Sequence, residues 1–194
     1  MKWVTWENVG VDRRRGSVRY SGGKVLPSAG ALHEALYSMS YAVRMSYKSK
    51  DVPVGYYEYT VFPLEGVWDL IDYSKPSTDK SNFKYTLMIR QPDFLTVEGF
   101  SRFLEQTKRK RSNPYLDTVR FEYVEDGLNC QMMHIGSFDD EPESFAQMEK
   151  YCTDHGFNRA SKIHREINLS DPRKTEPTKL KTVLRFHVKT KGRI

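Results

Sequence analysis

The sequence predicts an α+β fold of two pseudo-repeated βαββ halves with mainly antiparallel sheets and a ligand groove between them, the halves lying over residues 1–80 and 81–194. The main observation is that one order of elements occurs twice: helix, strand, Pro-containing turn, strand. The first series spans residues 28–91 and the second spans residues 140–188. A second observation is the Asp-Gly pair at 126–127, a strong hairpin signal. Two such halves can pair side by side, which leaves the groove.

The first series opens with a predicted helix at 28–47, with Ser28 as its N-cap. Apolar residues recur there at helical spacing and predict a buried stripe. The stripe consists of Leu32, Ala35, Leu36, Met39, Ala42 and Val43. Tyr37 and Tyr41 lie four residues apart on a flanking side, where they either border a groove or complete the edge of the core.

Residues 1–26 are harder to interpret, because they show only hints of short strands. Arg13 to Arg15 are interpreted as a solvated turn, with nucleic-acid contact as the minority alternative. Ser21-Gly22-Gly23 marks a loop. These residues either complete the first repeat or leave it without its opening strand.

After the first helix, residues 55–63 predict an aromatic-rich strand in which Tyr57 and Tyr59 share one face. Glu65 is expected in the turn that follows, with the amphipathic ring of Trp68 beside it. Glu65 is therefore either an ordinary turn acid or a functional carboxylate that acts together with its aromatic neighbour.

The polar loop 74–82 is the expected join between the halves. Residues 83–91 predict a strand that contains Tyr85 and is stopped by a proline. Thr96 is the expected N-cap of a helix at 97–110. The basic end of that helix complements the negative helix terminus, and no aromatic residue interrupts the basic run as in a nucleic-acid site.

Two strands, 118–124 and 128–135, are predicted to form a hairpin around Glu125-Asp126-Gly127. His134 lies near the end of the second strand, and a histidine in such a position is more often structural than catalytic. It is kept as a candidate ligand-binding residue. His155 and His164 are too scattered to form a zinc site with it, so no metal site and no cofactor are predicted.

The clearest helix is expected at 140–155, where Asp140 and Glu143 have the spacing of a capping box. Two strand-like runs follow, at 164–170 and 180–188. They are joined through a Ser-Asp-Pro turn, which completes the second series of elements.

The strand at 164–170 carries the main candidate for function. Alternation places Arg165 and Ile167 on one face, and His164, Glu166 and Asn168 on the other. Glu166 thus lies mid-strand among polar neighbours. It is either part of a solvated outer face or a carboxylate directed into a ligand groove.

Composition narrows the classes of protein. With 12 Tyr, 10 Phe and 3 Trp in 194 residues, the chain has more rings than a core of this size needs, so some are expected to line a pocket. The net charge of +6 is too diffuse to indicate nucleic-acid binding. The chain has two cysteines, no signal peptide and no apolar run of membrane-spanning length, so a reduced, cytoplasmic protein is expected. The expected oligomeric state is a monomer or a dimer.

Four segments together resemble the GyrI-like small-molecule-binding family, which includes effector-binding domains of multidrug-responsive regulators. They are PLEGVW (63–68), FKYTLMIRQPDFLT (83–96), QMMHIGSFDDEP (131–142) and HREINLSDPRKTEPTKLKTVLR (164–185). The resemblance implies that residues 1–194 form one domain of this family, with a groove between βαββ repeats that is faced by Glu166. The chain departs from the family at Asn168, where an aromatic residue is common.

The resemblance also implies three functions for the chain. The first is the binding of amphipathic, planar or cationic small molecules in the aromatic groove. The second is hydrolysis, because relatives in the stand-alone subgroup open the cyclopropane ring of DNA-alkylating antibiotics as a detoxification. The third is binding to a protein partner, as some GyrI relatives bind DNA gyrase.

The chemistry of these functions selects candidate residues. A carboxylate in a poorly hydrated groove attracts cations, or acts as a base once burial raises its pKa. Glu166 and Glu65 are the candidate bases, and a tyrosine is the candidate proton donor. The expected ligand-binding set is Tyr57, Tyr59, Trp68, Tyr85, His134, His164 and Glu166.

Overall fold

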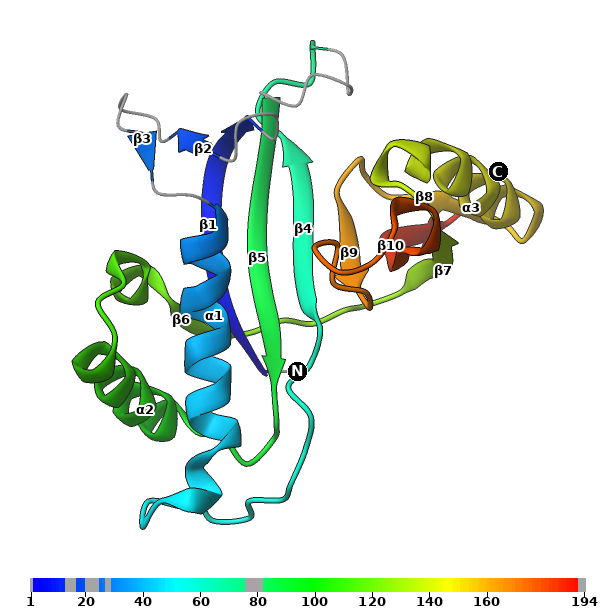
Figure 1. Ribbon diagram of the computed structural model, residues 1–194. Coiled ribbons are helices and arrows are strands. Elements are labelled where there is room, and N and C mark those ends of the chain that lie inside the picture. Colours follow the sequence, from blue (N-terminus) through cyan, green and yellow to red (C-terminus); the bar gives the residue numbers. More distant parts are fainter. Residues whose placement is uncertain (1, 13–16, 20–24, 27–28, 76–81, 192–194) are drawn as a thin grey trace. The chain divides into compact units, whose positions relative to one another are not determined.

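The computed structural model describes residues 2–12, 17–19, 25–26, 29–75 and 82–191 (Figure 1). The chain packs as two units, each with its own internal contacts. The first unit comprises Met1–Phe62 and Ile71–Val124, and the second comprises Pro63–Leu70 and Glu125–Ile194. In the second unit, the short segment Pro63–Leu70 packs with residues from the far end of the chain.

The first unit contains an antiparallel sheet in the order β3-β2-β1-β5. β6 pairs with the start of β1, on the edge opposite β5. Its strands are β1 (Lys2–Asp12), β2 (Ser17–Arg19), β3 (Val25–Leu26), β5 (Phe83–Gln91) and β6 (Arg120–Tyr123). Its helices are α1 (Ala29–Arg44) and α2 (Val97–Lys110). The predicted helices and the strand at 83–91 are therefore confirmed. β1 supplies the opening strand of the first repeat.

Local sequence signals explain these elements. The apolar stripe of α1 is buried at Leu32, Ala35, Leu36, Met39 and Val43, as its helical spacing predicts. Ala42, which was also predicted in the stripe, is only partly buried. The side chain of Thr96 accepts a hydrogen bond of 3.0 Å from the amide of Gly99, which confirms it as the N-cap of α2. Ser28, Arg13 to Arg15, Ser21 to Gly23 and most of the loop 74–82 lie outside the described residues.

The predicted strand at 55–63 is wrong. The rings of Tyr56 and Tyr57 lie 5.2 and 5.3 Å from the ring of Phe94, measured between centroids. No strand covers residues 55–63, and the shared partner fits this, because adjacent residues of a strand point to opposite faces. The strand instead begins at Leu64 and includes Glu65, which was predicted to lie in a turn.

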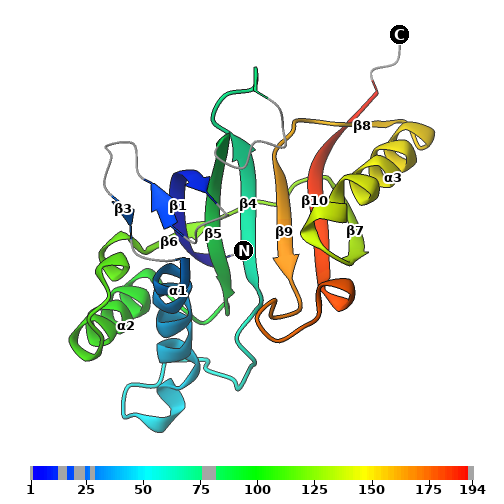
Figure 2. The ribbon, with the colours of Figure 1, turned by 45° about the horizontal axis from the view of Figure 1, so that its top comes forward.

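The second unit contains an antiparallel sheet in the order β4-β9-β10-β7, and β8 pairs with the far end of β10. Its strands are β4 (Leu64–Leu70), β7 (Asn129–Ile135), β8 (Phe157–Arg159), β9 (His164–Asn168) and β10 (Lys181–Thr190). Helix α3 (Glu141–Asp154) lies over one face of this sheet (Figure 2). Met148 and Cys152 of α3 pack there against Leu184 and Phe186 of β10.

Chain order therefore shows the predicted repeat as β1-α1-β4-β5 and β7-α3-β9-β10. The α+β class and the antiparallel pairing are confirmed. Among the described residues, no helix is long and apolar enough to cross a membrane.

Two predicted local features of the second series are wrong. The strands around Asp126-Gly127 do not form a hairpin, because β6 pairs with β1 and β7 pairs with β10. The side chain of Asp140 makes no capping hydrogen bond, because the residues before α3 form a 3-10 turn at Phe138–Asp140. Ser137 caps that turn by accepting from the amide of Asp139 at 3.2 Å.

Candidate functional site

Strand β9 has two chemically different faces, and the sheet register sets which residues occupy each. Glu166 lies opposite Gly66 of β4 and Leu184 of β10. Leu184 belongs to the core beneath α3, so Glu166 is on the α3 face. Arg165 lies opposite Arg185, on the other face of the same sheet.

The α3 face places three donor groups close together. Nε2 of His164 lies 3.5 Å from Oε1 of Glu166. Glu141, the first residue of α3, completes the group, and the ligand atoms of the three residues all lie within 4.8 Å of one another. Glu166 is 4% exposed and Glu141 is 6% exposed, so neither carboxylate is a solvated surface group.

Two aromatic residues lie beside this group. The ring of Phe145 meets the imidazole of His164 edge-on, with 4.8 Å between centroids. Trp68 lies opposite His164 in the register of β4 and β9 and thus on the same face of the sheet. On that face Gly66 is the β4 neighbour of Glu166 and brings no side chain. The face combines buried carboxylates with ring side chains, as a site for a cationic or planar ligand requires.

His134 lies on the α3 face but is held by its own chain. Its Nδ1 lies 2.9 Å from the hydroxyl of Ser144, and its Nε2 lies 2.9 Å from the carbonyl oxygen of Ser137. A carbonyl only accepts, so Nε2 carries the proton and Nδ1 accepts from Ser144. This geometry favours a structural role for His134, and its role in ligand binding stays a prediction.

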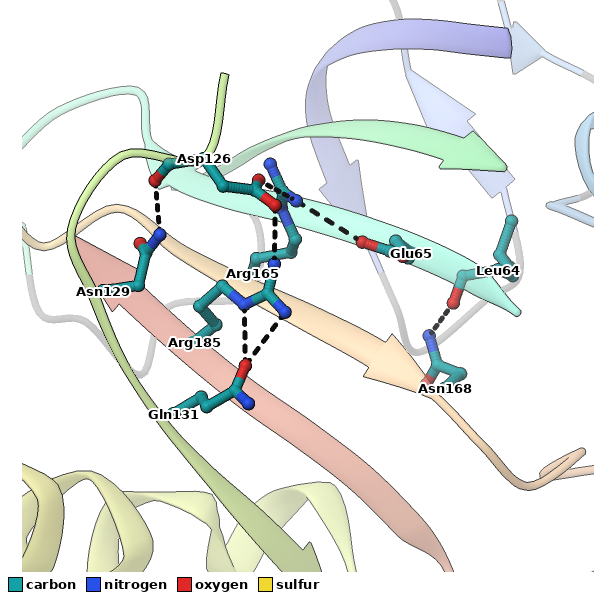
Figure 3. Close-up of polar contacts among 8 residues, drawn as sticks. All are labelled: Leu64, Glu65, Asp126, Asn129, Gln131, Arg165, Asn168 and Arg185. Atoms are coloured by element: carbon teal, nitrogen blue, oxygen red, sulfur yellow. Dashed lines mark hydrogen bonds and ion pairs between the residues drawn. The ribbon is translucent and has the colours of Figure 1, made fainter. Parts of the chain in front are cut away.

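The opposite face of the sheet carries a network of ion pairs (Figure 3). Arg165 lies 2.6 Å from one carboxylate oxygen of Asp126 and 3.6 Å from Glu65. Arg185 lies 3.0 Å from the other oxygen of Asp126 and also donates to Gln131. Two guanidinium groups thus balance two carboxylates. The register separates Glu65 from Glu166, because Glu65 lies opposite Ile167.

The remaining predicted site residues belong to the first unit. Tyr57 is half exposed, and Tyr85 is buried in β5. The ring of Tyr59 meets Phe94 edge-on and stacks on Phe62. Its hydroxyl is buried and has no hydrogen-bond partner among the described residues. Burial raises the pKa of Tyr59, so this hydroxyl keeps its proton and remains a donor at neutral pH.

The first unit also has an open groove of about 400 Å³ beside α1 and α2. Tyr37 and Tyr41 line it, so of the two positions expected for them they occupy the border of a groove. Glu34 and Arg111, 3.0 Å apart, contribute an ion pair to its lining. The groove thus offers aromatic surface together with both signs of charge.

Sequence reasoning missed Glu141 and Phe145. Both lie on α3, four residues apart and therefore on one side of the helix, and Glu141 is the first helical residue. The sequence alone shows that spacing. It does not show that both residues lie close to His164, because their position depends on how α3 packs against the sheet.

Comparison with solved structures shows close likeness along the whole chain. A hydrolase from Listeria innocua matches with 28% identity and a TM-score of 0.80, covering 97% of this chain and 87% of its own. Another structure of a hydrolase from Listeria innocua matches with 29% identity and a TM-score of 0.81, with the same coverage. An uncharacterised conserved protein from that organism has 28% identity and a TM-score of 0.82, covering 97% and 88%.

A more distant match concerns the fold alone. The C-terminal domain of EcmrR has 10% identity and a TM-score of 0.52, with 97% of this chain and 91% of that domain covered. No protein of curated function matches this chain. Residues 30–189, which are most of the sequence, match the GyrI-like small molecule binding domain. The chain therefore belongs to the GyrI-like small molecule binding domain family.

Proposed function

We propose that this chain binds amphipathic, planar or cationic organic molecules, with Glu166 as the anionic group of the site. The observation that carries the proposal is the burial of Glu166 beside Phe145, His164 and Trp68 on the α3 face. Membership of a small-molecule-binding family supports it. The proposal extends that membership to a class of ligand.

The physical reason is the environment of the carboxylate. A charge held away from water attracts an opposite charge more strongly than a surface group does, because the surroundings screen it less. Ring faces add cation–π attraction, which is worth about 0.5–2 kcal/mol per contact. A planar organic cation satisfies both the carboxylate and the rings, whereas a neutral compound of the same shape satisfies only the rings.

Isothermal titration calorimetry with planar aromatic cations and their neutral isosteres tests this proposal. The measurement uses chelator-treated protein, so that bound metal does not contribute. Glu166→Gln keeps the side-chain shape and removes the charge, so cation affinity should fall about tenfold or more, which corresponds to about 1.4 kcal/mol. Neutral isosteres should bind both forms equally.

The matched control is Glu143→Gln, which removes an exposed acid from the same helix that carries Glu141. It should leave cation affinity unchanged. Equal affinities of the wild type and Glu166→Gln for every cation tested would refute the proposal.

A hydrolase acting on activated cyclopropanes is the second candidate. The similarity to Listeria innocua hydrolase structures over 97% of this chain favours it. In the proposed step, water attacks a ring carbon as a base removes its proton. The carbon–carbon bond breaks, and its electron pair passes into a conjugated carbonyl whose oxygen is then protonated.

One residue of the second unit suits a role in this step. Glu166, which is buried on the α3 face, is the proposed base. Glu166→Gln should lower kcat more than it changes KM, because the base acts mainly in the transition state. Ring opening of a spirocyclopropane compound, followed by chromatography, measures this. Turnover that persists in Glu166→Gln would exclude this assignment.

A further inference from the structure

We propose that Glu141, His164 and Glu166 form a binding site for a divalent first-row transition-metal ion of the zinc class. The two carboxylates and the imidazole lie on the α3 face, and their ligand atoms are all within 4.8 Å of one another. The proposal does not rest on organic-ligand binding. It assigns a second, inorganic ligand to Glu166, so either proposal can fail alone.

The donor set fits such an ion. One imidazole nitrogen with two carboxylate oxygens is a combination that binds zinc, and three protein ligands leave the fourth tetrahedral position open. Metal–ligand bonds of about 2.0–2.1 Å at tetrahedral angles put neighbouring ligand atoms about 3.3 Å apart. The 3.5 Å between Nε2 of His164 and Oε1 of Glu166 is close to that edge length.

The second nitrogen of His164 supports the assignment. Its Nδ1 lies 3.4 Å from the carbonyl oxygen of Lys162, a long contact in which only the nitrogen can donate. A proton on Nδ1 leaves the lone pair of Nε2 available to a metal ion, on the side of the ring that faces Oε1 of Glu166. Metal-bound histidines commonly donate their other N–H to a backbone carbonyl in this way.

Burial of the carboxylates strengthens cation binding, and partial exposure of His164 lets an ion enter from solvent. Glu141 and Glu166 are more than nine-tenths buried, and a cation between two buried carboxylates removes their mutual repulsion. The side chain of His164 is 22% exposed, which provides a route from solvent. The edge-on ring of Phe145 holds the imidazole plane. Arg165, between the two β9 ligands in sequence, faces Asp126 on the other side of the sheet.

The test is titration of tag-free, chelator-treated full-length protein with Co²⁺, whose visible absorption is strong when its ligands are tetrahedral, followed by competition with Zn²⁺. One ion per chain should bind with tetrahedral absorption, and Zn²⁺ should displace it. Glu141→Gln and His164→Asn should each weaken Co²⁺ binding by at least about 10–100-fold. Zn²⁺ should also raise the unfolding temperature of the wild type and not of these variants.

The matched controls are Glu143→Gln on α3 and His155→Asn at its C-terminal end, both exposed residues of the same types. Unchanged affinity in the controls with loss in the ligand variants establishes the site. Equal affinity in all four variants, or no tetrahedral Co²⁺ absorption in the wild type, overturns it. If Glu141→Gln does not fold, His164→Asn decides the result, because its partly exposed side chain tolerates replacement.

One of these variants also separates this proposal from the organic-ligand proposal. Glu141→Gln retains Glu166, His164 and the rings beside them, so it should still bind planar cations in the presence of chelator. Loss of metal binding with retained cation binding is the expected combination. Metal binding in the wild type without any cation binding would support the metal site and refute the proposed organic ligand.

Discussion

The two faces of the second-unit sheet place charged residues under opposite conditions. On one face, Arg165 and Arg185 balance Asp126 and Glu65 in a set of ion pairs. On the other, the carboxylates of Glu166 and Glu141 lie together with the imidazole of His164. Neighbouring residues of one strand, Arg165 and Glu166, thus belong to a balanced network and to an anionic cluster.

This difference indicates where ligand binding belongs. A balanced buried network stabilises or orders the fold, and a cationic ligand gains little from it because its charges are already compensated. An anionic cluster beside aromatic rings gains when a cation arrives. We therefore expect substitutions on the Arg165 face to change stability, and substitutions on the Glu166 face to change binding.

The largest expected effect is on the Arg165 face. Arg165→Ala removes this cation from the buried carboxylate of Glu65 and one of the two guanidinium partners of half-buried Asp126, so the free energy of unfolding should fall by about 3–5 kcal/mol. Urea denaturation measures the change. A loss below about 1 kcal/mol would mean that the network is solvated and that the two faces do not differ as described.

Exchange of one acid for its amide on each face is the next comparison. Glu65→Gln should lower the free energy of unfolding by about 1–2 kcal/mol, because Arg165 loses one charged partner. Glu166→Gln should leave stability within about 1 kcal/mol, since a neutral amide relieves the negative cluster. Organic-cation affinity should fall more in Glu166→Gln than in Glu65→Gln. If one variant showed the larger loss in both stability and affinity, the two faces would not differ as described.

A smaller effect is expected from the aromatic ring above the cluster. Phe145→Leu keeps much of the apolar volume, so it should cost about 1–1.5 kcal/mol of stability. It removes the edge contact with His164, and planar cations should bind about two- to fivefold more weakly, within the range expected for one ring contact. Fluorescence titration measures that change. An affinity equal to that of the wild type would exclude Phe145 from the site.

The smallest effect is expected for an ion pair that lies in water. A hydrogen bond from the Arg173 side chain lowers the pKa of Asp171 to about 2, from an ordinary value of 3.8. A lowered folded-state pKa contributes stability above pH 3.8, and the contribution is lost as the pH falls toward 2. Arg173→Ala should raise this pKa toward 3.8 in an NMR titration.

The urea midpoint of Arg173→Ala at pH 7 should not move measurably, because the pair lies at the surface and water screens it. Arg165→Ala and Arg173→Ala are thus expected to give the largest and the smallest loss of stability among these variants. A midpoint shift as large as that of Arg165→Ala would show that burial does not explain the difference between the pairs.

The sequence by itself determined the elements whose signals are local. Helical spacing predicted α1 and its buried stripe, and Thr96 predicted the start of α2. Alternation predicted that Arg165 and Glu166 occupy opposite faces. These features depend on residues two to four positions apart, and the backbone geometry of helices and strands sets their relation before any tertiary contact forms.

Only the tertiary structure decided which segments meet. β4 pairs with β9, where Leu64 lies opposite Asn168 about a hundred positions later in the chain. Asp126, predicted as a hairpin residue, pairs with Arg165 and Arg185. Glu141 reaches His164 through the packing of α3. Strand pairing and helix docking are chosen by burial and charge balance summed over many residues, and no short stretch of sequence contains that sum.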